Sequence, residues 1–217
     1  MQQNTRTVPV TIDTLDAQLA GMLTIPKQAM GVVLFAHGSG SSRFSPRNQF
    51  VAEQLNEGGL ATLLFDLLTE QENLIDEQTM ALRFDIELLS QRLTGAIDWV
   101  GSQLQTQALS VGLFGASTGS AAALNAAARR QDSVKAVVSR GGRPDLASEL
   151  SRVKAPTLLI VGGLDGQVIE MNQAAAVELA AKHQIKIIPG ASHLFEQSGT
   201  LAAVATIART WFQKYLT

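Results

Sequence analysis

The sequence has 217 residues and contains no cysteine, only three histidines and no apolar run long enough to span a membrane. The absence of cysteine excludes disulfide bonds, thiolate zinc sites and a cysteine nucleophile. With only His37, His183 and His193 available, a histidine-rich metal site is not expected. The polar start of the chain, Met1 to Arg6, does not have the pattern of a signal peptide. We therefore expect a soluble cytoplasmic protein without a bound metal.

The sequence also lacks a large excess of positive or negative charge. The chain has 17 Lys and Arg against 19 Asp and Glu, a formal net charge of −2. No single-sign field is available to attract nucleic acid or an anionic membrane, so neither is expected as a partner. Hydrophobic residues make up 46% and charged residues 17%, which is typical of a compact globular protein. With no repeat or linker, residues 1–217 are expected to form one domain, and no oligomeric state is predicted.

Short apolar runs alternate with helix-length segments along most of the chain. The first two runs lie on either side of Asp13 to Asp16 and alternate in polarity, which predicts an antiparallel hairpin. The later runs are continuously apolar, as in strands buried on both faces. The expected strands are Val8–Ile12, Leu19–Ile25, Val32–Ala36, Ala61–Phe65, Leu109–Phe114, Val134–Val138, Thr157–Val161 and Ile185–Ile188. The expected helices are Asn48–Gly58, Thr79–Leu104, Ser120–Arg130, Val168–Lys182 and Leu201–Leu216.

This order predicts an α/β fold with a mostly parallel sheet and helices on both faces. Leu67 to Arg83 is expected as an acid-rich surface excursion, and the gap between Val138 and Thr157 is too short for a large lid domain. In such a sheet, reactive groups lie in the loops at the carboxyl ends of the strands. Those loops contain a serine, an acid and a histidine, in that order along the chain.

The serine lies in Gly115-Ala116-Ser117-Thr118-Gly119, which fits the G-x-S-x-G pattern of a nucleophile elbow. A tight strand-to-helix turn needs small residues beside the serine, and the alanine-rich segment that follows favours a helix. The N-terminus of that helix stabilises a developing oxyanion.

A second interpretation of the same stretch is a dinucleotide-binding turn. Val111 to Gly119 resembles a glycine-rich phosphate loop, and Arg140 at the end of the next strand is placed to hold a 2′-phosphate. Only 106 residues follow Val111, too few for a full dinucleotide domain and a substrate domain, so the elbow is favoured.

A nucleophilic serine needs a base that is oriented by an acid. His193 follows a buried strand, whereas His183 suits a helix end and His37 suits a loop-shaping role. Asp165 is the favoured acid, although an aspartate before a helix is also a common N-cap. Asp145 and Glu170 are the other acids available.

Two further features flank the predicted elbow. The oxyanion hole is expected to use the N–H groups of Thr118 and of Ser39, which lies in the loop His37-Gly38-Ser39-Gly40. Arg140 and Arg143 should border the mouth of the site and bind a carboxylate or phosphate of the substrate. The alternative is that these arginines pair with Asp145, with Asp66 or with the acid-rich 67–83 stretch.

These residues together resemble the α/β-hydrolase superfamily, and more narrowly the dienelactone-hydrolase-like proteins. The resemblance rests on the His37–Gly40 loop, the Gly115–Gly119 elbow, the strand ending near Asp165, and Ser192-His193 with Phe195 after it. It implies an eight-stranded sheet with the second strand antiparallel, and a serine hydrolase without a cofactor. Ser117 is then the nucleophile, Asp165 the acid and His193 the base. The dienelactone hydrolases proper use cysteine at the nucleophile position, where this chain has serine.

The function expected is cleavage of a small carboxylic ester, lactone or thioester through an acyl-enzyme. The alternative from another class is a binding or scaffold protein that retains the fold without turnover. Similar small hydrolases also occur fused to phosphoribosyltransferase-like domains, and this sequence contains no such domain.

Overall fold

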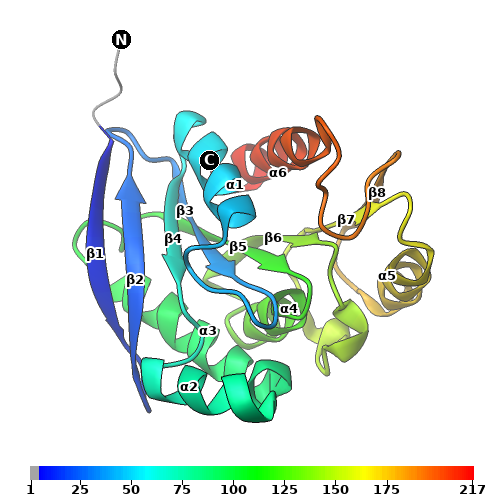
Figure 1. Cartoon of the computed structure of the whole chain (residues 1–217). Coiled ribbons are helices and arrows are strands. Elements are labelled where there is room, and N and C mark those ends of the chain that lie inside the picture. Colours follow the sequence, from blue (N-terminus) through cyan, green and yellow to red (C-terminus); the bar gives the residue numbers. More distant parts are fainter. Residues whose placement is uncertain (1–4) are drawn as a thin grey trace.

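The computed structural model describes residues 5–217, so the first four residues of the polar start lie outside it. Strands and helices alternate along most of the chain after an N-terminal hairpin (Figure 1). The strands are β1 (Arg6–Asp13), β2 (Gln18–Ile25), β3 (Gly31–Ala36), β4 (Ala61–Phe65), β5 (Ser110–Ala116), β6 (Val134–Arg140), β7 (Thr157–Gly162) and β8 (His183–Ile188). The α-helices are α1 (Pro46–Glu57), α2 (Glu70–Thr79), α3 (Ile86–Ser102), α4 (Gly119–Arg129), α5 (Gly166–Glu178) and α6 (Thr200–Leu216).

All eight strands form one mixed sheet in the order β1-β2-β4-β3-β5-β6-β7-β8. β2 is antiparallel to both of its neighbours, β1 and β4. From β4 to β8 every pairing is parallel. The α/β fold and the predicted hairpin are confirmed, and the carboxyl ends of the parallel strands meet at one edge of the sheet.

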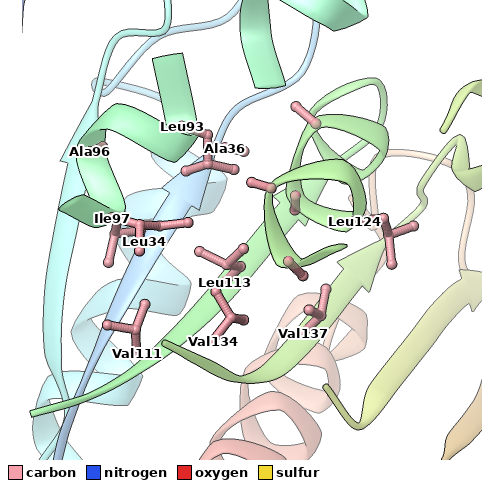
Figure 2. Close-up of a cluster of buried hydrophobic side chains, with 14 of the residues drawn as sticks. Leu34, Ala36, Leu93, Ala96, Ile97, Val111, Leu113, Leu124, Val134 and Val137 are labelled. Atoms are coloured by element: carbon pink, nitrogen blue, oxygen red, sulfur yellow. The ribbon is translucent and has the colours of Figure 1, made fainter. Parts of the chain in front are cut away.

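Helices cover both faces of the sheet (Figure 1). α1 and α6 pack on one face, and α3, α4 and α5 pack on the other. The central strands lie between these layers, which is why all six residues of β3 are buried. Figure 2 shows Leu34 and Leu113 of the sheet packed beside Leu93 and Ile97 of α3 and Leu124 of α4. Burial on both faces explains the continuous apolar runs in the sequence.

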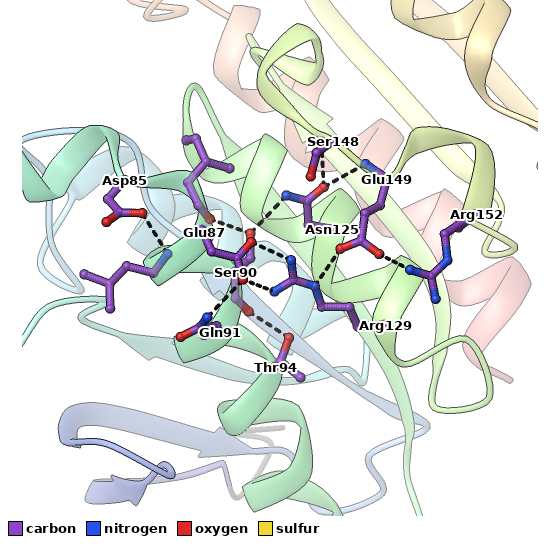
Figure 3. A network of polar contacts seen from close by, with 12 residues as sticks. Asp85, Glu87, Ser90, Gln91, Thr94, Asn125, Arg129, Ser148, Glu149 and Arg152 are labelled. Carbon is purple, nitrogen blue, oxygen red and sulfur yellow. Dashed lines mark hydrogen bonds and ion pairs between the residues drawn. The ribbon is translucent and has the colours of Figure 1, made fainter.

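A buried asparagine fixes α4, the helix that follows the predicted elbow (Figure 3). The Asn125 side chain donates to Ser90 Oγ of α3 at 3.2 Å and accepts from the N–H groups of Ser148 at 3.0 Å and Glu149 at 3.2 Å. Arg129, one turn further along α4, pairs with Glu87 and Glu149. These contacts connect α4 to α3 and to the segment after β6, and they limit sliding of α4 beneath the elbow.

The segment from 67 to 104 differs from the sequence-based expectation. A separate helix, α2, lies within the stretch expected as a surface excursion, and the following helix begins at Ile86 rather than Thr79. Thr69 and Glu72 form a reciprocal capping box that begins α2, and Met80 in the left-handed region ends it. Local capping therefore divides a region that apolar spacing alone had merged.

Two smaller features complete the fold. His183, expected near a helix end, is the first residue of β8. Between β6 and β7 the chain forms two 3₁₀ turns, Pro144–Leu146 and Leu150–Arg152, and no lid is inserted there. Within residues 5–217, the helices are too short or too polar to cross a membrane.

Candidate active site

Ser117 occupies the turn between β5 and α4 with a φ of 50°, a left-handed conformation that is costly for a residue with a side chain. Two backbone hydrogen bonds hold it in place. Its N–H donates to the Arg140 carbonyl at 3.2 Å, and its carbonyl accepts from the Arg143 N–H at 3.0 Å. A strained residue held by its surroundings is a frequent feature of functional sites.

The glycines of the G-x-S-x-G pattern are required by close backbone packing. A methyl group on Gly115 would lie 2.4 Å from Cα of Ser120, and one on Gly119 would lie 2.3 Å from the Ala36 carbonyl oxygen. Neither position tolerates a side chain without moving the backbone. The two glycines therefore allow the turn to pack closely against both α4 and the end of β3.

His193 and Asp165 are joined by a hydrogen bond of 2.6 Å between Nδ1 of the ring and Oδ2 of the carboxylate. Asp165 directly precedes α5, but its side chain makes no capping bond to that helix. The bond orients the imidazole and leaves Nε2 as the ring nitrogen available for proton transfer. The Asp165 side chain therefore contacts His193 and does not cap α5.

The turn after β6 connects the serine and the histidine. The Arg140 carbonyl at its start accepts from the Ser117 N–H, and the Arg143 N–H at its end donates to the Ser117 carbonyl. A methyl group on Gly141, between them, would lie 3.6 Å from Cε1 of His193. Asn172 of α5, which is buried, donates to the Gly142 carbonyl at 3.0 Å. The same turn is therefore in contact with the elbow, the histidine loop and the helix that follows Asp165.

The loop after β3 lies over the elbow. A methyl group on Gly38 would be 3.1 Å from Cβ of Ser117 and 3.8 Å from its Oγ. The Ser39 N–H donates to the Thr118 hydroxyl oxygen at 2.9 Å, so this N–H has a partner, where the sequence suggested a free donor. Thr118 is the N-cap residue of α4, and its side chain makes no capping bond to that helix. The Thr118 N–H has no such partner within residues 5–217.

His37 shapes this loop and is not placed as a base. Its Nε2 accepts the Leu67 N–H at 3.1 Å, and its Nδ1 lies 3.0 Å from the Gly38 carbonyl. Burial lowers the pKa of His37, although the Gly38 carbonyl and Asp66 oppose this shift. The ring is therefore neutral at pH 7, with its proton on Nδ1.

The two arginines expected at the mouth of the site differ in their surroundings. Arg143 forms a bidentate pair with Asp145, at 2.9 Å from Nε and 2.7 Å from Nη2, and Asp145 is one of the partners that the alternative interpretation named. The pair forms because the 3₁₀ turn Pro144–Leu146 returns Asp145 beneath the guanidinium. Arg140 has no such acid, and its Nη1 is buried without a hydrogen-bond partner.

A polar cleft of about 450 Å³ adjoins this edge of the sheet on the side of α2. Its lining includes Gly38, Ser39 and Gly40 of the β3 loop and the Arg83–Asp76 ion pair, with the Arg83 guanidinium beside Gly40. The loop that lies over Ser117 therefore also lines this cleft.

Two residues at the site were missed by sequence reasoning. The positive charge of Arg47, in the first turn of α1, adds to burial in lowering the pKa of Arg140, and Asn172 of α5 supports the turn after β6. A basic residue at a helix start opposes the helix dipole, and this is the one signal that could have indicated Arg47. Asn172 has no comparable signal, since a polar residue within a helix is ordinary.

The sheet order, the antiparallel second strand and the strained serine between β5 and α4 define an α/β hydrolase. The dienelactone hydrolase family model matches residues 19–216. The chain belongs to the dienelactone hydrolase family. This assignment leaves no support for the dinucleotide-binding alternative.

The chain is similar to several known proteins. A dienelactone hydrolase from Anabaena variabilis is 58% identical, with a TM-score of 0.97 over 98% of this chain and 99% of that one. A serine hydrolase without a lid from Xanthomonas campestris is 20% identical, with a TM-score of 0.77 over 97% and 95%, a likeness of fold alone. Two strains of Mycobacterium tuberculosis have a protein named as a proposed phosphoribosyl transferase that is 55% identical over 91% of this chain. The chain spans 44% of the length of those curated relatives.

Proposed function

We propose that this protein is a serine hydrolase that cleaves a small carboxylic ester, lactone or thioester through Ser117, His193 and Asp165. The observation that carries the proposal is the 2.6 Å hydrogen bond from His193 to Asp165, beside a turn that also holds Ser117 in its strained conformation. Nucleophilic catalysis by serine requires a base and an acid that orients that base, and this hydrogen bond supports the second requirement.

In this mechanism Ser117 Oγ attacks the carbonyl carbon of the substrate while His193 Nε2 accepts the hydroxyl proton. Asp165 stabilises the imidazolium that forms. His193 then returns the proton to the departing oxygen or sulfur, leaving an acyl group on Ser117. A water molecule, deprotonated by the same ring, attacks the acyl carbon and releases the acid and the free serine.

The proposed oxyanion hole consists of the N–H groups of Thr118 and Ser39. The Ser39 N–H bonds to the Thr118 hydroxyl in the structure, but an oxyanion is a stronger acceptor than a neutral hydroxyl. We therefore expect the oxyanion to take over this donor as the tetrahedral intermediate forms, with Thr118 Oγ1 holding Ser39 in position until then. One such donor contributes about 3 kcal/mol of transition-state stabilisation.

Reaction with a fluorophosphonate probe tests the nucleophile. Mass spectrometry should locate the label on Ser117 in the wild-type protein and find none in Ser117→Ala. Ser102→Ala, which removes a hydroxyl at the far end of α3, is the matched control and should be labelled like the wild type. No label under native conditions, or a label on another serine, contradicts the proposal and supports the non-catalytic binding protein instead.

A panel of nitrophenyl esters, thioesters and lactones then identifies the acyl bond. For any substrate that is hydrolysed, Ser117→Ala and His193→Ala should each lower kcat by about 10⁶-fold, because the three groups act as a unit. Wild-type turnover by Ser117→Ala would show that the nucleophile has been misassigned.

A further inference from the structure

The sheet ends in two edge strands, β1 and β8, and each presents one row of backbone groups to solvent. Within residues 5–217, β1 pairs only with β2, and β8 pairs only with β7. The unpaired N–H and C=O groups of an edge strand can pair with a strand of another chain. The two edges lie at opposite ends of the molecule (Figure 1), and they differ in whether such pairing is blocked.

The β1 edge is blocked by a proline. The Thr14 N–H, just after β1, donates to the Ala17 carbonyl at 2.9 Å. Because bonded positions alternate along an antiparallel pair, the even-numbered residues of β1 face β2 and the odd-numbered residues face outward. Pro9 lies in the middle of the outward-facing set and has no N–H to donate. Proline on an edge strand prevents a further strand from completing its hydrogen bonds there.

The β8 edge has no such block. The Thr157 N–H of β7 donates to the Lys182 carbonyl, just before β8, at 2.9 Å. The even-numbered residues of β8 therefore face β7, and the backbone groups of His183, Ile185 and Ile187 face outward. All three residues have an N–H, and the strand contains neither proline nor glycine. This edge can therefore accept a further strand along its whole length.

The side chains at the β8 edge are poorly covered. Of the six residues in β8 only Ile188 is buried, whereas all six residues of β7 are buried. Ile187 is 45% exposed, and Val177 of the adjacent helix α5 is 88% exposed. Ile185 packs against the core cluster to which α5 contributes, and Ile187, two residues further along the strand, lies on the same face. The edge thus combines outward-facing backbone groups with a partly exposed apolar row.

We propose that β8 pairs antiparallel with β8 of a second copy of this chain, which joins two eight-stranded sheets into one. A second copy fits this edge because the outward-facing set is symmetric about Ile185, its middle member. The alignment that uses the whole set places Ile185 opposite Ile185 of the second copy, and His183 opposite Ile187 of the second copy. Every outward-facing N–H then has a carbonyl partner. The isoleucine side chains of both copies meet on the face covered by α5.

Lys186 is the residue of β8 that opposes this pairing, since lysine on an edge strand disfavours association. Its side chain lies on the face opposite to Ile185 and Ile187. In the proposed alignment it lies diagonally across from Lys186 of the second copy, about 7–8 Å away. The two ammonium groups repel each other at that distance, and salt screens the repulsion. The dimer is therefore expected to become tighter as the salt concentration rises.

Pairing would restrain the two elements that lead to the proposed acid and base. Asp165 directly precedes α5, and His193 follows the end of β8 by five residues. The inference does not depend on the proposed hydrolase function, because association is measured without a substrate.

Sedimentation equilibrium of the full chain measures the association state. The mass should rise from 23.1 kDa toward twice that value as the protein concentration increases. Added salt and Lys186→Gln should each lower the dissociation constant of the dimer, whereas Lys27→Gln, in the loop between β2 and β3, should leave it unchanged. A mass of 23.1 kDa at every concentration, or weaker association at high salt, overturns the proposal.

Cysteine cross-linking tests the alignment, because the chain has no native cysteine. Bonded residues opposite each other in an antiparallel pair have Cα atoms about 5.5 Å apart, which is within the range of a disulfide. Ile185→Cys should therefore form a disulfide-linked dimer under mild oxidation, detected by non-reducing electrophoresis. Thr11→Cys, at an exposed, outward-facing position of β1, is the matched control and should not be cross-linked. Equal cross-linking of the two variants, or none of Ile185→Cys, overturns the alignment.

Proline at two neighbouring positions separates pairing at the edge from stability of the fold. Ile187→Pro removes an N–H that faces the second copy, so it should weaken the dimer about 10-fold or more while the Tm of the dilute monomer stays near that of the wild type. Lys186→Pro removes an N–H that faces β7, so its Tm should fall. Ile187→Lys, which keeps the N–H but adds a charge to the apolar row, should also weaken the dimer. An Ile187→Lys protein that associates as tightly as the wild type overturns the proposal, whether or not the proline variants fold.

Discussion

Gly119→Ala is the most direct test of the packing that shapes the elbow. The added methyl group would lie 2.3 Å from the Ala36 carbonyl oxygen and 2.5 Å from that of His37. Both are backbone atoms at the end of a buried strand, so the contact cannot be relieved by a change of rotamer. α4 and β3 must separate, and the loop over Ser117 must move with them.

The expected cost follows from this geometry. Overpacking typically destabilises a protein by about 1–3 kcal/mol, and a contact with rigid backbone belongs at the upper end of that range. For a chain of this length, about 3 kcal/mol corresponds to a fall in Tm of about 6–12 °C. Fluorophosphonate labelling of Ser117 should also slow, because the elbow shifts relative to the Gly38–Gly40 loop.

Gly101→Ala is the matched control. No atom lies within 4 Å of a methyl group at Gly101, which is on the exposed side of α3 near its end. Alanine restricts the unfolded chain and favours the helix, so this change should stabilise the protein by about 0.5 kcal/mol. Thermal unfolding followed by circular dichroism measures both variants. A Gly119→Ala protein that melts within a degree of the wild type and labels at the same rate would refute the reasoning.

Three further predictions concern single side chains. Asp165→Asn should lower kcat about 10⁴-fold with little change in Tm, because the amide disturbs the His193 tautomer; a loss below about tenfold in steady-state kinetics would assign the acid elsewhere. The pKa of His37 is lowered in the folded state, so the free energy of unfolding should fall as the pH drops from 7 toward 5; urea titrations should show a smaller pH dependence for His37→Gln, and an unchanged slope would contradict the shift. Asp76→Ala should destabilise the protein by about 3 kcal/mol, because the buried Asp76 carboxylate accepts two hydrogen bonds from Arg83; equal Tm values would show that this pair is unimportant.

Much of the fold can be read from the sequence because burial on both faces leaves a continuous apolar signal. Each expected strand overlaps an observed one, and Ser117, Asp165 and His193 follow strands β5, β7 and β8 as predicted. Their proposed roles await experiment. The order of polar residues after buried strands is informative because parallel strands bring their carboxyl ends to one edge.

The rest depends on contacts between distant parts of the chain. Arg140 and Arg143 look equivalent in sequence, but only Arg143 pairs with Asp145. Arg140 Nη1 has no hydrogen-bond partner within residues 5–217. The effect of the Arg47 charge on the pKa of Arg140 depends on the packing of α1 on the sheet, which no local pattern encodes. The bond between Ser39 and Thr118 likewise joins two loops 79 residues apart. Side-chain partnerships of this kind are set by tertiary geometry rather than by spacing.

The positive φ of Ser117 has a consequence for how proteins of this fold diverge. Glycine adopts that conformation without the penalty of about 1–2 kcal/mol that a side chain incurs. A single codon change from serine to glycine would therefore remove the proposed nucleophile and relieve strain at the same position, while leaving the neighbouring cleft and cations in place. If Ser117 acts as proposed, selection for turnover opposes this substitution. Where that selection is relaxed, a hydrolase of this kind has a short and thermodynamically favourable route to becoming a receptor for its former substrate.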